Sequence, residues 1–349
     1  MNSFEIAGRP IGPDHSCYLI AELSANHGQE IETALELVRA AKKAGADAIK
    51  LQTYRADTIT LDCDSPVFRI GKGTAWEGRR LFDLYEEAHT PWEWHKQLFA
   101  EAARLNLHCF SSPFDPTAVD FLENLGAPAY KIASFEIVDH ELIARCAATG
   151  KPMILSTGMA AREEIAEAVS VAREHGCSSL SLLRCVSAYP APPGEMNLST
   201  MADLSTTFAC PVGLSDHTLG TAIPVAAVTL GASIIEKHLT LSRAAGGPDA
   251  HFSLEPEEFA LMAQSVRDAQ EAIGEPSYEL TESQTASRMF RRSLFASADI
   301  KAGETLNAQN VRSVRPGNGL APKHLPAVLG KKATQDIPLG TPLDWDLLE

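Results

Sequence analysis

Two histidines close successive apolar runs late in the chain, in positions where both could bind one divalent ion. His217 ends the run 212–217, and His238 ends the run 234–238. Acidic side chains lie nearby, at Asp216, Glu236 and Asp249. A single histidine is more often structural, but two on adjacent strand ends favour a shared metal site. Two protein ligands leave positions for water and substrate, which suits a catalytic metal; manganese is our first expectation, with magnesium or cobalt as alternatives.

Two lysines lie inside apolar runs, where an ammonium facing the apolar helices would be costly to bury. Lys50 and Lys131 could instead point into a pocket, together with the serines of neighbouring runs, Ser112, Ser134, Ser156 and Ser215. Ammonium and hydroxyl donors of this kind predict an anion-binding cradle. Two alternatives stay open. The polar groups could merely satisfy one another, or one lysine, its pKa lowered by burial, could form the Schiff base of an aldolase.

Carboxylates at further strand ends could move protons, orient water or hold sugar hydroxyls. The candidates are Glu22, Glu136 and Asp249, although each could equally pair with a lysine. Tyr189 begins a proline-rich stretch and either presents its hydroxyl or forms a simple turn. Aromatic residues in and after a long connection either pack a helix or wall a sugar site. They are Trp76, Tyr85, Trp92 and Trp94.

Eight short apolar runs carry most of these residues, and each run breaks into polar residues at its C-terminal end. The runs span 17–22, 48–53, 108–112, 130–134, 153–157, 180–185, 212–217 and 234–238. Helical stretches separate most of them, and a glycine that can end a helix usually precedes the next run. Eight strand–helix units predict a closed (β/α)8 TIM barrel, in which the C-terminal strand ends ring the active site.

The predicted barrel domain covers residues 1–274, with a hairpin over 4–12 closing its floor. Its first helix should place Ile31, Leu35, Val38 and Ala41 on one face. Its last helix should carry Phe259, Met262, Val266 and Ile273 at helical spacing and end at Gly274. The connection from Tyr54 to about Pro91 is too long for an ordinary barrel loop, so we expect a lid or a substrate-reading element.

The end of the chain has a different pattern. Residues 275–289 are polar and predict a linker. Residues 290–349 carry short β-like pieces and predict a small β-rich domain with a thin core, and such modules often dock on something larger.

Composition limits the choice of partners. The formal net charge of −15 argues against nucleic acid or an anionic membrane, because both select basic surfaces. The first residues lack the regions of a signal peptide, and no apolar stretch is long enough to span a bilayer. Seven cysteines without a Cys-x-x-Cys pair fit reduced thiols, with Cys17, Cys109 and Cys185 as core residues. We therefore expect a cytoplasmic protein.

Ordered motifs cover nearly the whole chain, at residues 20–27, 49–53, 130–136, 155–159, 213–218, 236–240 and 247–249. Together they closely resemble the sialic acid synthases. Arg315–Gly319 resembles the C-terminal antifreeze-like domain of that family. Within the family, Trp76–Gly78 and Ala88–His95 resemble the pseudaminic acid synthase branch.

The resemblance implies condensation of phosphoenolpyruvate with the open-chain aldehyde of an N-acetylated amino sugar, giving a nine-carbon 2-keto sugar acid and phosphate. For the branch, the implied acceptor is 2,4-diacetamido-2,4,6-trideoxy-L-altrose. The implied metal ligands are His217 and His238, and the implied phosphoenolpyruvate contacts are Lys50, Ser112, Lys131, Ser134, Ser156 and Ser215. Glu22, Tyr189 and Asp249 match sugar- or water-handling positions, and Glu136 matches a candidate acid or base. Arg315 matches an arginine that reaches the neighbouring subunit's site, which implies a domain-swapped homodimer.

Three other functions compete with this one. The same chemistry on another acceptor would give N-acetylneuraminic or legionaminic acid. A Schiff-base aldolase would resist chelators and be trapped by borohydride. A sugar-binding protein without activity should depart from the family at the catalytic positions, and the sequence shows no such departure.

Overall fold

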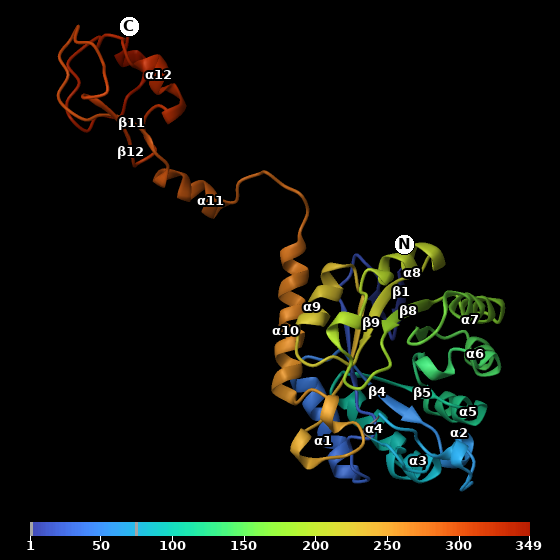
Figure 1. The fold of residues 1–349 in the computed structure, drawn as a ribbon. Helices are drawn as coiled ribbons and strands as arrows, with labels where there is room; N and C mark the ends of the chain where they lie inside the picture. The colour runs from blue at the N-terminus through green and yellow to red at the C-terminus, as the bar shows by residue number, and fades with distance from the viewer. Residues whose placement is uncertain (1–2, 74–75) are drawn as a thin grey trace. The chain divides into compact units, whose positions relative to one another are not determined.

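The computed structural model describes residues 3–73 and 76–349, which form two compact units divided after Gly274. In the first unit, eight parallel strands close into a barrel in the order β10-β3-β4-β5-β6-β7-β8-β9 (Figure 1). The strands are β3 Tyr18–Glu22, β4 Ala48–Thr53, β5 His108–Pro113, β6 Tyr130–Ile132, β7 Met153–Ser156, β8 Leu180–Cys185, β9 Val212–Asp216 and β10 Ile234–His238. The TIM-barrel prediction is confirmed, and the predicted runs agree with these strands to within two residues at each end.

Helices cover the outside of the barrel, and α10 packs against both α9 and α1, the helices that flank it around the ring (Figure 1). The helices are α1 Ile31–Lys43, α4 Trp92–Arg104, α5 Pro116–Leu125, α6 His140–Ala147, α7 Arg162–Glu174, α8 Thr200–Phe208, α9 Ala222–Thr229 and α10 Pro256–Ile273. The buried residues of α1 are Ala34, Leu37, Val38 and Ala41, so the predicted face is rotated and Ile31 and Leu35 lie at its margin. Ile273 ends α10 with its side chain 54% exposed, outside the core.

The predicted hairpin closes the barrel floor. Its strands, β1 Phe4–Ile6 and β2 Arg9–Ile11, pair in antiparallel fashion. Ile6 and Ile11 are fully buried and pack with barrel-interior side chains such as Phe110. Because apolar side chains fill this end, the polar interior is confined to the opposite end of the barrel.

The connection between β4 and α4 has structure of its own. It contains α2 Ala56–Ile59, a single 3₁₀ turn at Pro66–Phe68, and α3 Leu81–Ala88. Thr74 and Ala75, in the glycine-punctuated part of the predicted lid or substrate-reading element, lie outside the described residues.

In the second unit, a short helix interrupts the stretch that we predicted to be a linker. This helix, α11 Glu282–Ser287, is capped by Thr281, whose side chain accepts a hydrogen bond from the backbone N–H of Gln284. β11 Ser293–Ala296 and β12 Val311–Val314 pair in antiparallel fashion, a one-turn helix α12 follows at Leu325–Val328, and isolated bridges join the remaining pieces. No helix in the described part of the chain combines the length and apolarity needed to cross a bilayer.

A buried ion pair joins β9 and β10 on the outer face of the barrel. Lys237 is 1% exposed, and its ammonium donates to Asp216 Oδ2 at 2.5 Å and to the Thr218 carbonyl. We expect Lys237→Met to lower the free energy of unfolding by about 3 kcal/mol, because it leaves the Asp216 carboxylate buried without its cation. Urea unfolding of the wild type and the variant measures this difference.

The matched control is Lys301→Met, which removes the cation of the exposed Lys301–Asp336 pair. Solvent screens that pair, so its loss should leave the urea midpoint almost unchanged. Equal midpoints for Lys237→Met and Lys301→Met would contradict a stabilising role for the buried pair.

Candidate active site

The strand register brings charged side chains together inside the C-terminal end of the barrel. Glu22 of β3 is the register partner of both Lys50 on β4 and His238 on β10. Glu236 lies two residues before His238 and pairs in register with Ser215 on β9. Alternate residues of a strand share one face, so Glu236 and His238 both point inward while Lys237 points outward.

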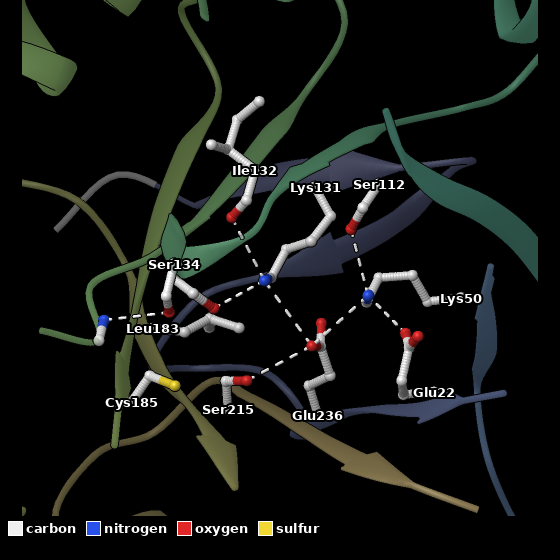
Figure 2. Close-up of polar contacts among 12 residues, drawn as sticks. Glu22, Lys50, Ser112, Lys131, Ile132, Ser134, Leu183, Cys185, Ser215 and Glu236 are labelled. Carbon is white, nitrogen blue, oxygen red and sulfur yellow. Dashed lines mark hydrogen bonds and ion pairs between the residues drawn. The ribbon is translucent and has the colours of Figure 1, made fainter. Parts of the chain in front are cut away.

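Lys50 lies between two carboxylates (Figure 2). Its ammonium forms an ion pair with Glu22, lies 3.7 Å from Glu236 Oε1 and donates to Ser112 Oγ at 3.2 Å. Lys50 is 3% exposed. Burial opposes its charge, but the two carboxylates prevail and raise the pKa of Lys50. The Lys50 side chain is therefore held as a cation, which does not favour it as a Schiff-base nucleophile.

Lys131 of β6 approaches the same carboxylate, Glu236, as Lys50 does (Figure 2). Its ammonium lies 3.7 Å from Glu236 Oε1 and donates to Ser156 Oγ at 2.6 Å and to the Ile132 carbonyl at 3.3 Å. Burial lowers the pKa of Lys131, and the more distant Glu236 only partly offsets that effect. Lys131 has one carboxylate neighbour where Lys50 has two, so a bound anion would meet less competing negative charge at Lys131 and would favour its charged form.

The other two predicted cradle serines lie beside this cluster. Ser215 donates to Glu236 Oε1 at 3.4 Å, and Ser134 accepts from the Gly158 amide at 3.1 Å. A Cβ at Gly158 would lie 2.7 Å from Ser134 Oγ, so only glycine allows this approach. All six residues predicted to bind the anion therefore converge at the barrel mouth.

The two predicted metal ligands lie side by side, with ring centroids 5.4 Å apart. His217 Nδ1 lies 2.9 Å from the Val186 carbonyl; because a carbonyl only accepts, Nδ1 carries the proton and Nε2 keeps a lone pair. His238 Nδ1 is buried and has no hydrogen-bond partner among the described residues. Burial holds the pKa of His238 well below its usual range, so this imidazole stays neutral.

These features fit a divalent ion. A ligating histidine commonly donates its second ring N–H to a backbone carbonyl, as His217 does to Val186. Across the described residues, no group of three or more His, Cys, Asp and Glu side chains is arranged to hold a metal. An ion at the histidines would therefore complete its shell with water or substrate, as a catalytic metal does.

Beside the histidines opens a cavity of about 530 Å³, whose polar lining includes Glu136, Tyr189, His238 and Asp249. The Tyr189 ring packs on His217 with centroids 4.5 Å apart. Asp249 accepts a hydrogen bond from Ser24, and burial raises the pKa of its carboxyl. Arg315 lies in the second unit, just after β12, and its reach to a neighbouring subunit's site stays a prediction.

A sequence profile of the NeuB family matches residues 37–278. This range contains most of the barrel and every predicted site residue except Glu22 and Arg315. The chain belongs to the NeuB family. A SAF domain matches residues 291–349.

Relatives resemble this NeuB chain over nearly its full length. The pseudaminic acid synthase of Campylobacter jejuni is 46% identical over 95% of this chain and 96% of its own. The N,N'-diacetyllegionaminic acid synthase of Legionella pneumophila is 35% identical over 98% of this chain and 97% of its own. Among solved structures, a spore coat polysaccharide biosynthesis protein of Bacillus subtilis has a TM-score of 0.68 at 32% identity, covering 100% of this chain and 99% of its own.

The structure adds residues that the sequence analysis left without a role in this NeuB site. From the sequence, Glu236 is only an acid beside the histidines, yet its carboxylate lies within ion-pair distance of both Lys50 and Lys131. Its position two residues before His238 on the same strand could have indicated that it faces inward. Gln52 donates to Glu22 at 3.0 Å, and its spacing of two from Lys50 marks the same face. Cys185 is buried as predicted, at 2% exposed, but it is more than a core residue, because its Sγ lies 3.8 Å from His217 Nδ1.

The aromatic residues divide between the two roles that the sequence left open. Trp92 stacks on Phe121 with centroids 4.5 Å apart, and Trp94 meets His27 edge-on, so both pack α4. Trp76 and Tyr85 instead line the cavity.

Glu136 should make stability depend on pH. Burial raises the pKa of its carboxyl to about 7, above the ordinary glutamate value of 4.5, and Oε2 has no hydrogen-bond partner among the described residues. The folded state therefore favours the neutral form of the Glu136 carboxyl. The resulting contribution to the free energy of unfolding is fully present below pH 4.5 and is lost as the pH rises through 7. We expect Glu136→Gln to exceed the wild type by about 3 kcal/mol in unfolding free energy at pH 8 and to match it at pH 4.

Chemical unfolding at both pH values tests this expectation. The control is Glu163→Gln, at an exposed position on α7, and its unfolding free energy should match that of the wild type at both pH values. A constant difference between Glu136→Gln and the wild type across this range would mean that the carboxyl does not ionise near pH 7.

Proposed function

We propose that this chain condenses phosphoenolpyruvate with 2,4-diacetamido-2,4,6-trideoxy-L-altrose and water, giving pseudaminic acid and phosphate. The observation that carries the proposal is the pair of buried lysines with serine hydroxyls, set beside two histidines at one cavity. The greater identity to a pseudaminic than to a legionaminic acid synthase supports the choice of acceptor.

The lysines and serines hold the donor substrate. Phosphoenolpyruvate carries a phosphate and a carboxylate, and Lys50 and Lys131 offset their charge within a protein of net charge −15. Ser112 and Ser156 accept from the lysines, which leaves each hydroxyl proton free to donate to the bound anion.

The reaction forms one carbon–carbon bond and one bond from C2 to the oxygen of water, and it breaks the bond from C2 to the phosphate oxygen. The enol carbon of phosphoenolpyruvate attacks the acceptor aldehyde, whose oxygen takes up a proton and becomes a hydroxyl group, and positive character develops at C2. Water adds to C2 as Glu136 takes one of its protons, which balances the proton taken up by the aldehyde oxygen. Collapse of the resulting tetrahedral centre forms the C2 carbonyl, breaks the C2–O bond to phosphate and releases phosphate together with the remaining hydroxyl proton. Tyr189 and Asp249 orient the sugar. His217 and His238 would hold a divalent ion, manganese being our choice, and such an ion would supply Lewis-acid polarisation of the aldehyde.

The test is phosphate release from phosphoenolpyruvate in the presence of manganese. The acceptors to compare are the diacetamido-trideoxy altrose, its legionaminic-type counterpart and N-acetylmannosamine. Release with the altrose alone supports the proposal. Release only with another acceptor keeps the chemistry and overturns the acceptor, whereas no release with any of them overturns the synthase.

Borohydride separates this chemistry from that of a Schiff-base aldolase. A synthase should lose activity with a chelator and form no adduct when borohydride is added with substrate. Mass spectrometry would detect a reduced adduct on Lys131, the lysine whose pKa burial lowers.

We also propose a homodimer in which each second unit covers the partner's barrel mouth, in the cytoplasm where phosphoenolpyruvate is made. Apolar side chains exposed beside the mouth support this arrangement, among them Phe135 at 60% and Met159 at 59%. The second unit exposes Phe290 at 60%. Burying such groups would stabilise a dimer.

Complementation tests whether Arg315 acts in the neighbouring site. Arg315→Ala and His238→Ala should each be nearly inactive. Mixed dimers formed by refolding both together would contain one intact site, built from His238 of one chain and Arg315 of the other. Recovery of activity supports the exchange, and a fully active monomer by light scattering would overturn it.

A further inference from the structure

The cavity beside the histidines is chemically divided. Its polar part, described above, lies near the two imidazoles. The remaining lining is largely apolar and includes Ile59, Ile70, Leu81, Leu84, Ala88 and Phe114. All of these except Phe114 come from the long connection between β4 and α4, so one segment of the chain supplies most of an apolar wall.

Backbone pairing and ion pairs order this segment. Arg69 and Arg80 form an antiparallel bridge, next to which the Ile70 amide donates to the Arg79 carbonyl at 2.9 Å. Arg80 also pairs with Asp62 at 2.8 Å and with Asp83 at 2.5 Å. The segment is therefore tied to itself at several points, which suits a fixed wall.

Trp76 connects the same segment to the loops that follow β8 and β10 at the barrel mouth. Its indole N–H donates to the Pro248 carbonyl at 3.1 Å. Its ring meets Tyr189 edge-on at 5.9 Å and His251 at 6.4 Å. The segment thus leaves β4 and reaches the loops that follow β8 and β10, and five of its apolar residues line the cavity, namely Ile59, Ile70, Leu81, Leu84 and Ala88.

An apolar wall selects against hydroxyl groups. A hydroxyl placed against Ile59, Leu81 and Leu84 would lose its hydrogen bonds to water and find no partner among these side chains, whereas a methyl group would fit. Pockets of this kind discriminate by about 10²-fold when an analogue adds a hydroxyl. The reacting aldehyde belongs near the histidines, so the end of the sugar remote from the aldehyde extends toward the wall.

We propose that Ile59, Ile70, Leu81, Leu84 and Ala88 form a specificity wall that accepts the C6 methyl group of a 6-deoxy amino sugar and disfavours a C6 hydroxyl. This inference rests on the proposed function and assigns acceptor selectivity to the segment between β4 and α4. The wall contacts substrate without taking part in bond making, so its substitution changes acceptor preference rather than phosphoenolpyruvate binding.

The experiment compares two acceptors that differ only at C6, the diacetamido-trideoxy altrose and its 6-hydroxy counterpart. We expect the wild type to prefer the 6-deoxy acceptor by about 10²-fold in kcat/KM. In Leu81→Asn the preference should fall to about 10-fold or less, with the KM for phosphoenolpyruvate unchanged, because the new amide can bond to the hydroxyl. Leu84→Asn is a second wall variant, should either one fold poorly.

The matched control is Val67→Asn, in the same segment but 78% exposed and outside the cavity lining. It should keep the wild-type preference. An undiminished preference in both folded wall variants would overturn the wall and leave the proposed synthase standing. A wild type that releases phosphate only with N-acetylmannosamine, which has a C6 hydroxyl, would overturn the proposed acceptor and the wall together.

Discussion

Lys131→Met should reduce kcat/KM for phosphoenolpyruvate by about 10³-fold, since the loss of one preorganised donor to an anion costs up to that much. Lys131 is the lysine of the site with fewer carboxylate neighbours, because Glu236 lies 3.7 Å away while Glu22 pairs with Lys50 alone. Without Lys131, the remaining charges are one lysine and two carboxylates, which together repel an anionic substrate. Steady-state phosphate release and equilibrium binding of phosphoenolpyruvate both measure the loss.

Two further variants separate charge from covalent chemistry. Lys131→Arg keeps the positive charge but cannot form a Schiff base, so it should retain more activity than Lys131→Met. Lys151→Met removes a lysine that pairs with Glu123 away from the cavity and should act as wild type. If Lys131→Arg and Lys131→Met were equally inactive while both remained folded, an anion-binding role for Lys131 would lose its support.

Much of this site follows from the sequence because a parallel barrel converts order along the chain into proximity. Once eight runs are recognised as strands, polar residues at their C-terminal ends must meet, whatever their separation in sequence. Lys50 and Lys131 are 81 positions apart, yet both reach one oxygen of Glu236. The same rule would have included Glu236, because a strand residue two before an inward-facing histidine also faces inward.

No comparable rule predicts how the loops between strands and helices place their side chains. The length of the segment after β4 indicated a functional element, but its apolar wall depends on which side chains turn toward the cavity. Trp76 finds its partners at Pro248 and Tyr189, contacts that no spacing in the sequence indicates. Cys185 belongs to an apolar run and was assigned by residue type, although its position at the strand end brings it to His217.

His238→Ala should abolish tight manganese binding and reduce turnover by about 10³-fold, since Lewis-acid polarisation contributes several kcal/mol to such reactions. His238 stays neutral because burial lowers its pKa, so one ring nitrogen keeps a lone pair that a metal can take without competition from a proton. His217 differs: burial opposes its charge, but its hydrogen bond with Cys185 prevails and raises the pKa of His217. Protons should therefore compete for His217 first, and manganese affinity should fall as pH is lowered.

Manganese binding followed by electron paramagnetic resonance tests this without relying on turnover. Losing an outer partner of a metal ligand typically weakens metal affinity by about 10- to 100-fold. His238→Ala removes a ligand itself, so we expect it to weaken the manganese affinity by more than that. His175→Ala, an exposed histidine at the end of α7, is the matched control and should bind manganese as wild type. Phosphoenolpyruvate should still bind to His238→Ala, because Lys50 and Lys131 remain in place. Unchanged manganese affinity in His238→Ala would move the ion away from the two histidines, and the aldehyde would then need another electrophilic partner within the cavity.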